Sequence, residues 1–320
     1  MEFKDYIPKS FCREFVEIKG DAGQIGMYMA LVLGFKPLMD DWVAIKKLEE
    51  FKKVCKRYKL YVREDAVFLN VNKDDLPKNI IGRQYLTTTS AYGLPLNTVN
   101  TGAVHLFLSR KRSLLKKGMW YPLIIKDRVI FQLKADLLTY GYALGYPECC
   151  IRFFRKFNIW TKYSHLYEIY KNTQGRPSFL CNPFLKDTTY SYIYHMPCSY
   201  NCENTVNLVK GLRDKIRKRE PDFVNLTDRY LKMPFLVFYE RKIYCFEGKS
   251  LGNNHLKYRK VYFVGSDKTK DIYGQDLKMA DALRLEARTM RLLRKGRVVK
   301  TIAIPLTNFA PETPFLIQFF

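Results

Sequence analysis

Two groups of cysteines are the residues in this sequence best suited to chemistry. Cys149 and Cys150 closely follow Pro147, and Cys198 and Cys202 are separated by three residues. That separation fits compact zinc sites, whose paired ligands have about two to four residues between them. Iron–sulfur clusters are also held by cysteine thiolates. The pattern therefore predicts a metal centre that holds either zinc or an iron–sulfur cluster.

Both cysteine groups coincide with the predicted starts of helices. Proline is favoured at the first helical position, so Pro147 predicts a helix over residues 147–157 with Cys149 and Cys150 in its first turn. Cys202 comes just before an amphipathic helix predicted over residues 205–218. Unpaired N–H groups and a partial positive charge at a helix start lower a thiol pKa. They favour the thiolate, which is the form that binds metal.

Two further residues are candidate ligands. His195 precedes Cys198 by three residues, and Cys181 lies upstream of both. Adjacent side chains are expected to diverge, so one of Cys149 and Cys150 would bind metal while the other packs or carries chemistry. The alternatives are that the cysteines are small buried hydrophobes or act in thiol catalysis without metal. The candidate ligands are Cys149, Cys150, Cys181, His195, Cys198 and Cys202.

The stretches Gly145-Tyr-Pro-Glu-Cys-Cys-Ile-Arg-Phe-Phe154 and His195-Met-Pro-Cys-Ser-Tyr-Asn-Cys202 also resemble hallmarks of a known family. This is the prokaryotic, largely archaeal family named domain of unknown function 483. The matching core runs over residues 103–212. The resemblance implies one site containing Cys149, Cys150, His195, Cys198 and Cys202, and it implies no particular reaction.

The chain is strongly basic. Its 320 residues carry a formal net charge of +24, and the usual reason for such self-repulsion is a polyanionic partner, above all nucleic acid. Basic side chains crowd two predicted helices, at 205–218 and 276–295, and predict a phosphate-binding surface for RNA. A merely solvated face is the alternative. The candidate residues are Lys210, Arg213, Arg217, Lys218, Arg219, Arg288, Arg291 and Arg294.

The N-terminus lacks the layout of a signal peptide, and no window approaches the roughly 18 apolar residues of a membrane span. We therefore expect a cytoplasmic protein without membrane segments. Its eight cysteines should stay reduced in that compartment.

The residue patterns predict an α+β fold. It has a mixed α/β N-terminal part, a central helical region that bears the cysteines, and a C-terminal β-meander with a long helix. Two domains are expected, over residues 1–220 and 221–320. Helices are predicted at 24–33, 41–58, 132–144, 147–157, 205–218 and 276–295. Strands are predicted at 66–71, 103–108, 235–240, 242–247, 257–264 and 298–304, with a strand pair within 121–131. Residues 158–196 read as irregular, and His105 as a hydrogen-bonded core residue.

The leading hypothesis is a metal- or iron–sulfur-dependent enzyme, a transferase or oxidoreductase, acting on RNA or another nucleotide-bearing substrate, as in tRNA modification. One alternative is a nucleic-acid-binding protein with a purely structural zinc site. Another is a redox or sulfur-handling enzyme with a small substrate. An open coordination position would separate a catalytic metal from a structural one.

Overall fold

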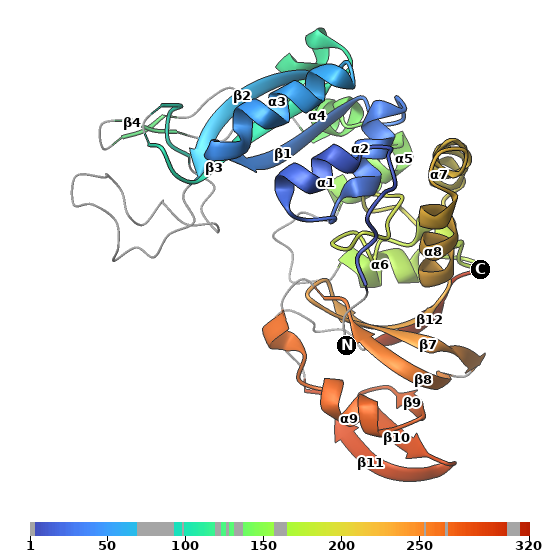
Figure 1. The fold of residues 1–320 in the computed structure, drawn as a ribbon. Coiled ribbons are helices and arrows are strands. Elements are labelled where there is room, and N and C mark those ends of the chain that lie inside the picture. The colour runs from blue at the N-terminus through green and yellow to red at the C-terminus, as the bar shows by residue number, and fades with distance from the viewer. Residues whose placement is uncertain are drawn as a thin grey trace. The chain divides into compact units, whose positions relative to one another are not determined.

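The computed structural model describes residues 4–68, 93–97, 99–118, 123–125, 128–130, 137–156, 165–252, 254–265, 268–305 and 314–320 (Figure 1). Helices and antiparallel sheets together form the predicted α+β fold. The chain divides into two compact units. One comprises residues 1–8, 22–26 and 152–320, and the other comprises residues 9–21 and 27–151. The predicted boundary at 220–221 falls inside the first of these units, and the division into domains 1–220 and 221–320 remains a prediction.

The unit formed by residues 9–21 and 27–151 is built on a small antiparallel sheet with the strand order β1-β3-β2. One face packs against helices through an aromatic cluster in which Phe15 stacks on Tyr28 at 4.2 Å and meets Phe51 edge-on at 5.6 Å. On the other face, Leu38 and Phe107 join a buried cluster with Ala143 and Leu144. The elements are α1 (Arg13–Lys19), α2 (Ile25–Val32), β1 (Leu38–Ala44), α3 (Leu48–Arg57), β2 (Tyr61–Phe68), β3 (Ala103–Ser109), the hairpin β4 (Leu123–Ile125) and β5 (Arg128–Ile130), and α4 (Leu137–Ala143).

The predicted helix over residues 41–58 is wrong in its first part. Residues up to Ala44 belong to β1, which pairs with β3 from Leu38↔Ser109 to Ala44↔Ala103. Trp42 and Val43 suit a strand because bulky and β-branched side chains pack well on a pleated surface. The helix itself begins at Leu48, where Phe51, Val54 and Cys55 form its buried stripe. The boundary between strand and helix is decided by pairing with a strand some sixty residues away. A local sequence pattern carries no information about that pairing.

The unit that contains residues 152–320 carries a second sheet, with the order β11-β10-β9-β8-β7-β6-β12 among the described residues. One face of its meander packs against the short helix α9 (Gly274–Met279; Figure 1). Leu283 and Met290 of the sheet share a buried cluster with Leu277 of this helix and with Tyr273 just before it. The elements of this unit are α6 (His165–Lys171), α7 (Glu203–Arg217), α8 (Pro221–Leu231), β6 (Pro234–Tyr239), β7 (Lys242–Gly252), β8 (His255–Phe263), α9 (Gly274–Met279), β9 (Ala282–Glu286), β10 (Thr289–Arg294), β11 (Arg297–Ala303) and β12 (Phe315–Gln318).

The predicted long helix over residues 276–295 is wrong. Only α9 (Gly274–Met279) is helical there, and the rest forms the antiparallel strands β9 and β10. Burial alternates from Leu283 to Glu286 in β9, with Leu283 and Leu285 inside and Arg284 outside, which is the period of a strand. Lys295 and Gly296 both have positive φ, at 51° and 79°. They form the two-residue loop of a β-hairpin rather than the end of a helix.

The other predicted elements have mixed outcomes. The predicted strands at 103–108, 235–240, 242–247, 257–264 and 298–304 and the pair within 121–131 are confirmed. Residues 158–196 are not wholly irregular, because they contain helix α6 and a short 3₁₀ turn at Phe179–Cys181. Residues 69–71 of the predicted strand at 66–71 and residues 132–136 of the predicted helix at 132–144 lie outside the described residues. Among the helices of the described part, none combines the length and the apolar character needed to cross a membrane.

Candidate metal centre

Cys149 and Cys150 are placed by a glycine turn followed by a helix start. Helix α5 (Glu148–Lys156) follows Pro147, whose carbonyl accepts hydrogen bonds from the N–H groups of Cys150 and Ile151, both at 3.0 Å. Helix α4 ends just upstream at Ala143, and Gly145, two residues further on, has a φ of 78°. The bonds Tyr146 N–H to Gly141 O (3.1 Å) and Gly145 N–H to Tyr142 O (3.0 Å) form a Schellman cap. The predicted position of both cysteines in the first helical turn is confirmed.

Cys198 and Cys202 lie in a loop that is hydrogen-bonded to the end of α6. Asn172 Nδ2 donates to the carbonyl of Cys198 at 2.7 Å, and the Tyr200 N–H donates to Thr173 Oγ1 at 2.8 Å. Tyr200 is completely buried, and its hydroxyl donates to the carbonyl of Leu166 at 2.9 Å. Sequence reasoning missed these anchors, because α6 was not predicted and no local signal links residues 172–173 to the cysteine loop.

Cys202 occupies the N-cap of α7. Its carbonyl accepts the first intrahelical bond, from the Val206 N–H at 2.9 Å. Val209, Leu212 and Ile216 are buried along the helix, as its amphipathic pattern predicted. The core face of α7 thus positions Cys202, and the second expected pairing of a cysteine with a helix start is confirmed.

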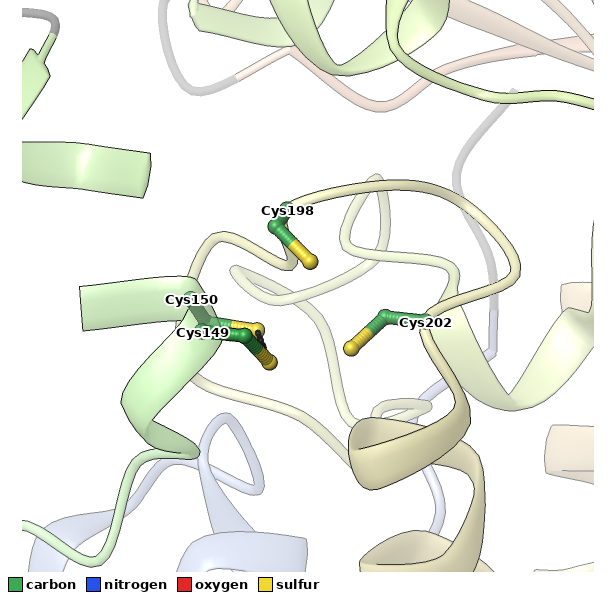
Figure 2. A group of neighbouring side chains, drawn as sticks. All are labelled: Cys149, Cys150, Cys198 and Cys202. Carbon is green, nitrogen blue, oxygen red and sulfur yellow. Dashed lines mark hydrogen bonds between the residues drawn. The ribbon is translucent and has the colours of Figure 1, made fainter. Parts of the chain in front are cut away.

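The thiols of Cys149, Cys150, Cys198 and Cys202 form one cluster (Figure 2). Their four sulfur atoms all lie within 4.8 Å of one another. Cys150 and Cys202 are buried, whereas Cys149 and Cys198 are half-buried. None of the chain's eight cysteines, which all lie in the described residues, forms a disulfide. Four neighbouring thiols of this kind could bind a metal ion.

The expected divergence of the two adjacent cysteines is wrong. The sulfur atoms of Cys149 and Cys150 are 3.9 Å apart and point toward the same space as Cys202 (Figure 2). Consecutive side chains leave a helix about 100° apart, but each cysteine sulfur lies one bond beyond Cβ, so the χ1 rotamers can still bring the two sulfurs together. Both thiols are thus available to one site.

The other two candidate ligands lie outside this group. His195 Nε2 is 3.0 Å from Thr205 Oγ1, in the first turn of α7. The Cys181 thiol is buried and donates to the carbonyl of Cys202 at 3.5 Å. Both side chains contact the segment that carries Cys202 rather than joining the four sulfurs. Their assignment as ligands remains a prediction.

No family model, curated protein or solved structure matches this chain. The functional argument therefore depends on the site itself and on the charged surfaces of the described residues.

The predicted nucleic-acid-binding residues occupy different elements. Lys210, Arg217, Lys218 and Arg219 are exposed on α7 or just after it. Arg213, also on α7, is half-buried and bound to Asp228 of α8, with Nε 2.9 Å from Oδ1. Arg291 and Arg294 are exposed on strand β10, and Arg288 is half-buried just before it. The second basic surface is thus part of a sheet rather than a helix.

Proposed function

We propose that this chain is a nucleic-acid-binding protein whose four-cysteine cluster holds one structural zinc ion. The observation that carries the metal assignment is the spacing of the sulfurs. A tetrahedral zinc ion with Zn–S bonds of about 2.3 Å holds its sulfur ligands about 3.8 Å apart. The Cys149 and Cys150 sulfurs are 3.9 Å apart, and all four lie within 4.8 Å. An iron–sulfur cluster places its own iron and sulfide atoms between the cysteines. That arrangement needs a wider spacing, so the donor set favours a single ion.

The donor set also favours a structural role over a catalytic one. Four thiolates fill the four positions of zinc, whereas catalytic zinc sites have three protein ligands and keep one position open. The sequence-based hypothesis of a metal- or iron–sulfur-dependent enzyme acting on RNA stays a prediction, as does that of a redox enzyme with a small substrate. Membership in the domain of unknown function 483 family likewise stays a proposal.

The proposed nucleic-acid interface is the open face of the C-terminal meander. In the register of the sheet, His255 of β8 pairs with Arg284 of β9, which pairs in turn with Arg291 of β10. A second row pairs Lys249 of β7 with Lys257 of β8. Leu256, Leu283 and Met290 point to the opposite face, where they join the buried cluster around Leu277. The basic side chains thus share the side of the sheet that faces away from this core.

This face holds like charges directly opposite one another. Lys249 faces Lys257, and Arg284 faces Arg291. Directly opposed like charges destabilise a sheet, by amounts comparable to the roughly 0.2–1 kcal/mol that favourable pairs contribute. Arg291 is partly compensated by Glu286, at 3.0 Å, and both side chains are about half exposed. A row of phosphates would neutralise the positive charges that Glu286 does not compensate, and a polyanion therefore fits this surface.

Metal analysis tests the zinc assignment. Protein purified without oxygen should contain about one zinc per chain and be colourless. Cys150→Ala should lose the zinc and unfold more easily, because the free energy of binding a structural metal is folding free energy. Cys245→Ala is the matched control, since Cys245 is equally buried but lies in β7 outside the cluster. Stoichiometric iron with visible absorption, or full zinc retention in Cys150→Ala, would refute the assignment.

Salt-dependent RNA binding tests the interface. Each phosphate contact on a single strand contributes about −0.7 to the slope of log affinity against log salt. Replacing Lys257, Arg284 and Arg291 with glutamine should therefore flatten the slope by about 2. The control removes the same charge by replacing the exposed Lys210 and Lys215 of α7 and the exposed Lys218 just after it, and it should leave the slope nearly unchanged. If the slope changes only in the control variant, the nucleic-acid interface lies on α7 instead of the sheet. If the wild-type protein does not bind RNA, nucleic acid is rejected as the partner.

A further inference from the structure

The four thiols of the cysteine cluster differ in their access to solvent. Cys149 and Cys198 are half-buried, whereas Cys150 and Cys202 are buried. Oxidants such as hydrogen peroxide react with thiolates, and the susceptibility of a cysteine follows its thiolate character and its exposure. A thiol bound to zinc is already a thiolate. The two half-buried cysteines are therefore the positions at which a peroxide reaches the cluster.

Cys198 and Cys202 belong to one short loop, and both point toward the middle of the cluster (Figure 2). Three residues separate them in sequence, and their sulfur atoms lie within 4.8 Å of each other. Because a disulfide bond is about 2.05 Å long, the two sulfurs need to approach by at most about 2.8 Å. A change of one χ1 rotamer moves a sulfur on this scale. The loop can thus close a disulfide without being rebuilt.

The adjacent pair on α5 is much less suited to a disulfide. Neighbouring Cα atoms are about 3.8 Å apart across a trans peptide bond, whereas disulfides usually join Cα atoms that are about 4.4–6.8 Å apart. Cys149 and Cys150 also lie in the first helical turn, which such a bond would distort. Of the two neighbouring pairs, Cys198 and Cys202 are therefore the one that can be oxidised with little strain.

The loop of Cys198 and Cys202 is held by contacts that involve no sulfur atom. Tyr200 is completely buried, its hydroxyl donates to a carbonyl of α6 at 2.9 Å, and its N–H donates to Thr173 Oγ1 at 2.8 Å. Asn172 Nδ2 donates to the Cys198 carbonyl at 2.7 Å, and the Cys202 carbonyl accepts the first bond of α7. These bonds keep the two thiols close together after a metal has left, which allows the oxidation to be reversed.

We propose that Cys198 and Cys202 form a reversible oxidation site, at which hydrogen peroxide converts two zinc-bound thiolates into a disulfide and releases the metal. The Cys198 sulfur attacks one peroxide oxygen, the O–O bond breaks, and the departing hydroxide takes up a proton to become water. Cys198 is then a sulfenic acid. The Cys202 thiolate attacks the Cys198 sulfur, the S–O bond breaks, and the second hydroxide also becomes water. The two thiolates thus supply the two electrons that reduce the peroxide.

The inference rests on the proposed zinc assignment and adds a means of regulating that site. A disulfide offers no thiolate to a metal, so only Cys149 and Cys150 remain as ligands, whereas a structural zinc ion has four. The zinc ion should therefore leave, and the protein should melt at a lower temperature because the free energy of metal binding is lost. A dithiol reductant restores the thiolates by thiol–disulfide exchange, after which zinc can bind again.

Combined zinc and disulfide analysis tests this site. The zinc-loaded full chain is treated with hydrogen peroxide, and zinc release is followed with a coloured zinc-binding dye. Thiols that remain are alkylated before digestion with trypsin. Trypsin leaves Cys198 and Cys202 in one peptide, residues 187–210, and the two cysteines of α5 in another, residues 135–152. We expect about one zinc ion released for each peptide 187–210 that resists alkylation, an alkylated peptide 135–152, and recovery of both signals after dithiothreitol and zinc are added.

The possible outcomes separate this inference from the zinc assignment. Protein that contains no zinc before oxidation refutes the assignment, and this inference falls with it. Zinc that stays bound while peroxide is consumed, or that leaves without the disulfide in peptide 187–210, overturns this inference alone. Cys181→Ser is the matched control, because the Cys181 thiol contacts the Cys202 carbonyl and is outside the group of four sulfurs. This variant should release zinc as the wild type does, and a loss of the disulfide in it would assign the oxidation to Cys181 instead.

The variant Cys202→Ser tests the order of the two steps. Without its partner thiol, the sulfenic acid at Cys198 persists, and dimedone should label Cys198 at least about fivefold more than in the wild type. A folded variant without this increase would reject Cys198 as the residue that peroxide attacks. If the variant does not fold, the peptide analysis of the wild type still decides whether the disulfide forms.

Discussion

Arg213 is predicted to stabilise the fold rather than to bind phosphate. Its guanidinium contacts Asp228 with Nε at 2.9 and 3.0 Å from the two carboxylate oxygens, and the side chains are only 18% and 13% exposed. Asp228 also accepts a hydrogen bond from the Tyr192 hydroxyl at 2.8 Å. The hydrogen bond with Asp228 raises the pKa of Arg213, despite partial burial. The pair joins α7 to α8.

The expected magnitude follows from burial. Removing one partner of a fully buried ion pair costs about 3–5 kcal/mol, and exposed pairs contribute about 0–1 kcal/mol. Because this pair is mostly but not fully enclosed, Arg213→Gln should cost about 2–3 kcal/mol. The neighbouring Arg217 is 44% exposed and reaches Asp228 only at 3.2 Å, so Arg217→Gln should cost less than about 1 kcal/mol.

Urea unfolding followed by circular dichroism measures both values, with unchanged slopes expected because the exposed surface is similar. A double-mutant cycle with Asp228→Asn should give a coupling energy of about 1–3 kcal/mol for Arg213. This reasoning would be refuted by equal losses of unfolding free energy in Arg213→Gln and Arg217→Gln. A coupling energy near zero between Arg213 and Asp228 would also refute it. Arg213 would then be available for phosphate binding after all.

Two further predictions concern a turn and a titrating carboxylate. Gly145→Ala should cost at least about 1–3 kcal/mol in urea unfolding, because the residue has a φ of 78° and its Cβ would meet Pro37 at 2.4 Å, and a neutral result would show that the turn can rearrange. The pKa of Glu247 is lowered chiefly by the hydrogen bond from the Tyr262 hydroxyl, at 2.7 Å. A lowered folded-state pKa contributes stability above the unfolded value of about 4.3 that is lost as the pH falls through the folded value. Tyr262→Phe should therefore destabilise the protein more at pH 7 than at pH 3, and an equal loss at both pH values would contradict the assignment.

The local features of the cysteine motifs could be read from the sequence. Pro147 predicts the start of α5, and the apolar spacing of Val209, Leu212 and Ile216 predicts the helix that Cys202 caps. Both signals act within a few residues, through the geometry of proline and the period of a helix. The three strands after residue 234 were also predictable, because their apolar runs and turns are local.

The long-range features could not be read this way. The apolar residues between 276 and 295 fit a helix nearly as well as strands, and pairing with β8 decides in favour of β9. Similarly, the lysine and arginine run of α7 gives no sign that Arg213 meets Asp228, fifteen residues further on.

The sequence by itself determined which residues carry thiols and where helix starts would favour their ionised form. Only the tertiary structure decided that Cys149 and Cys150 lie beside Cys198 and Cys202 and that Cys181 and His195 lie outside this group. It alone also placed Asp65 against His105, forty residues away in sequence. The physical reason is that helix caps and turns depend on neighbouring residues, whereas contacts between distant side chains depend on how separate elements pack and register.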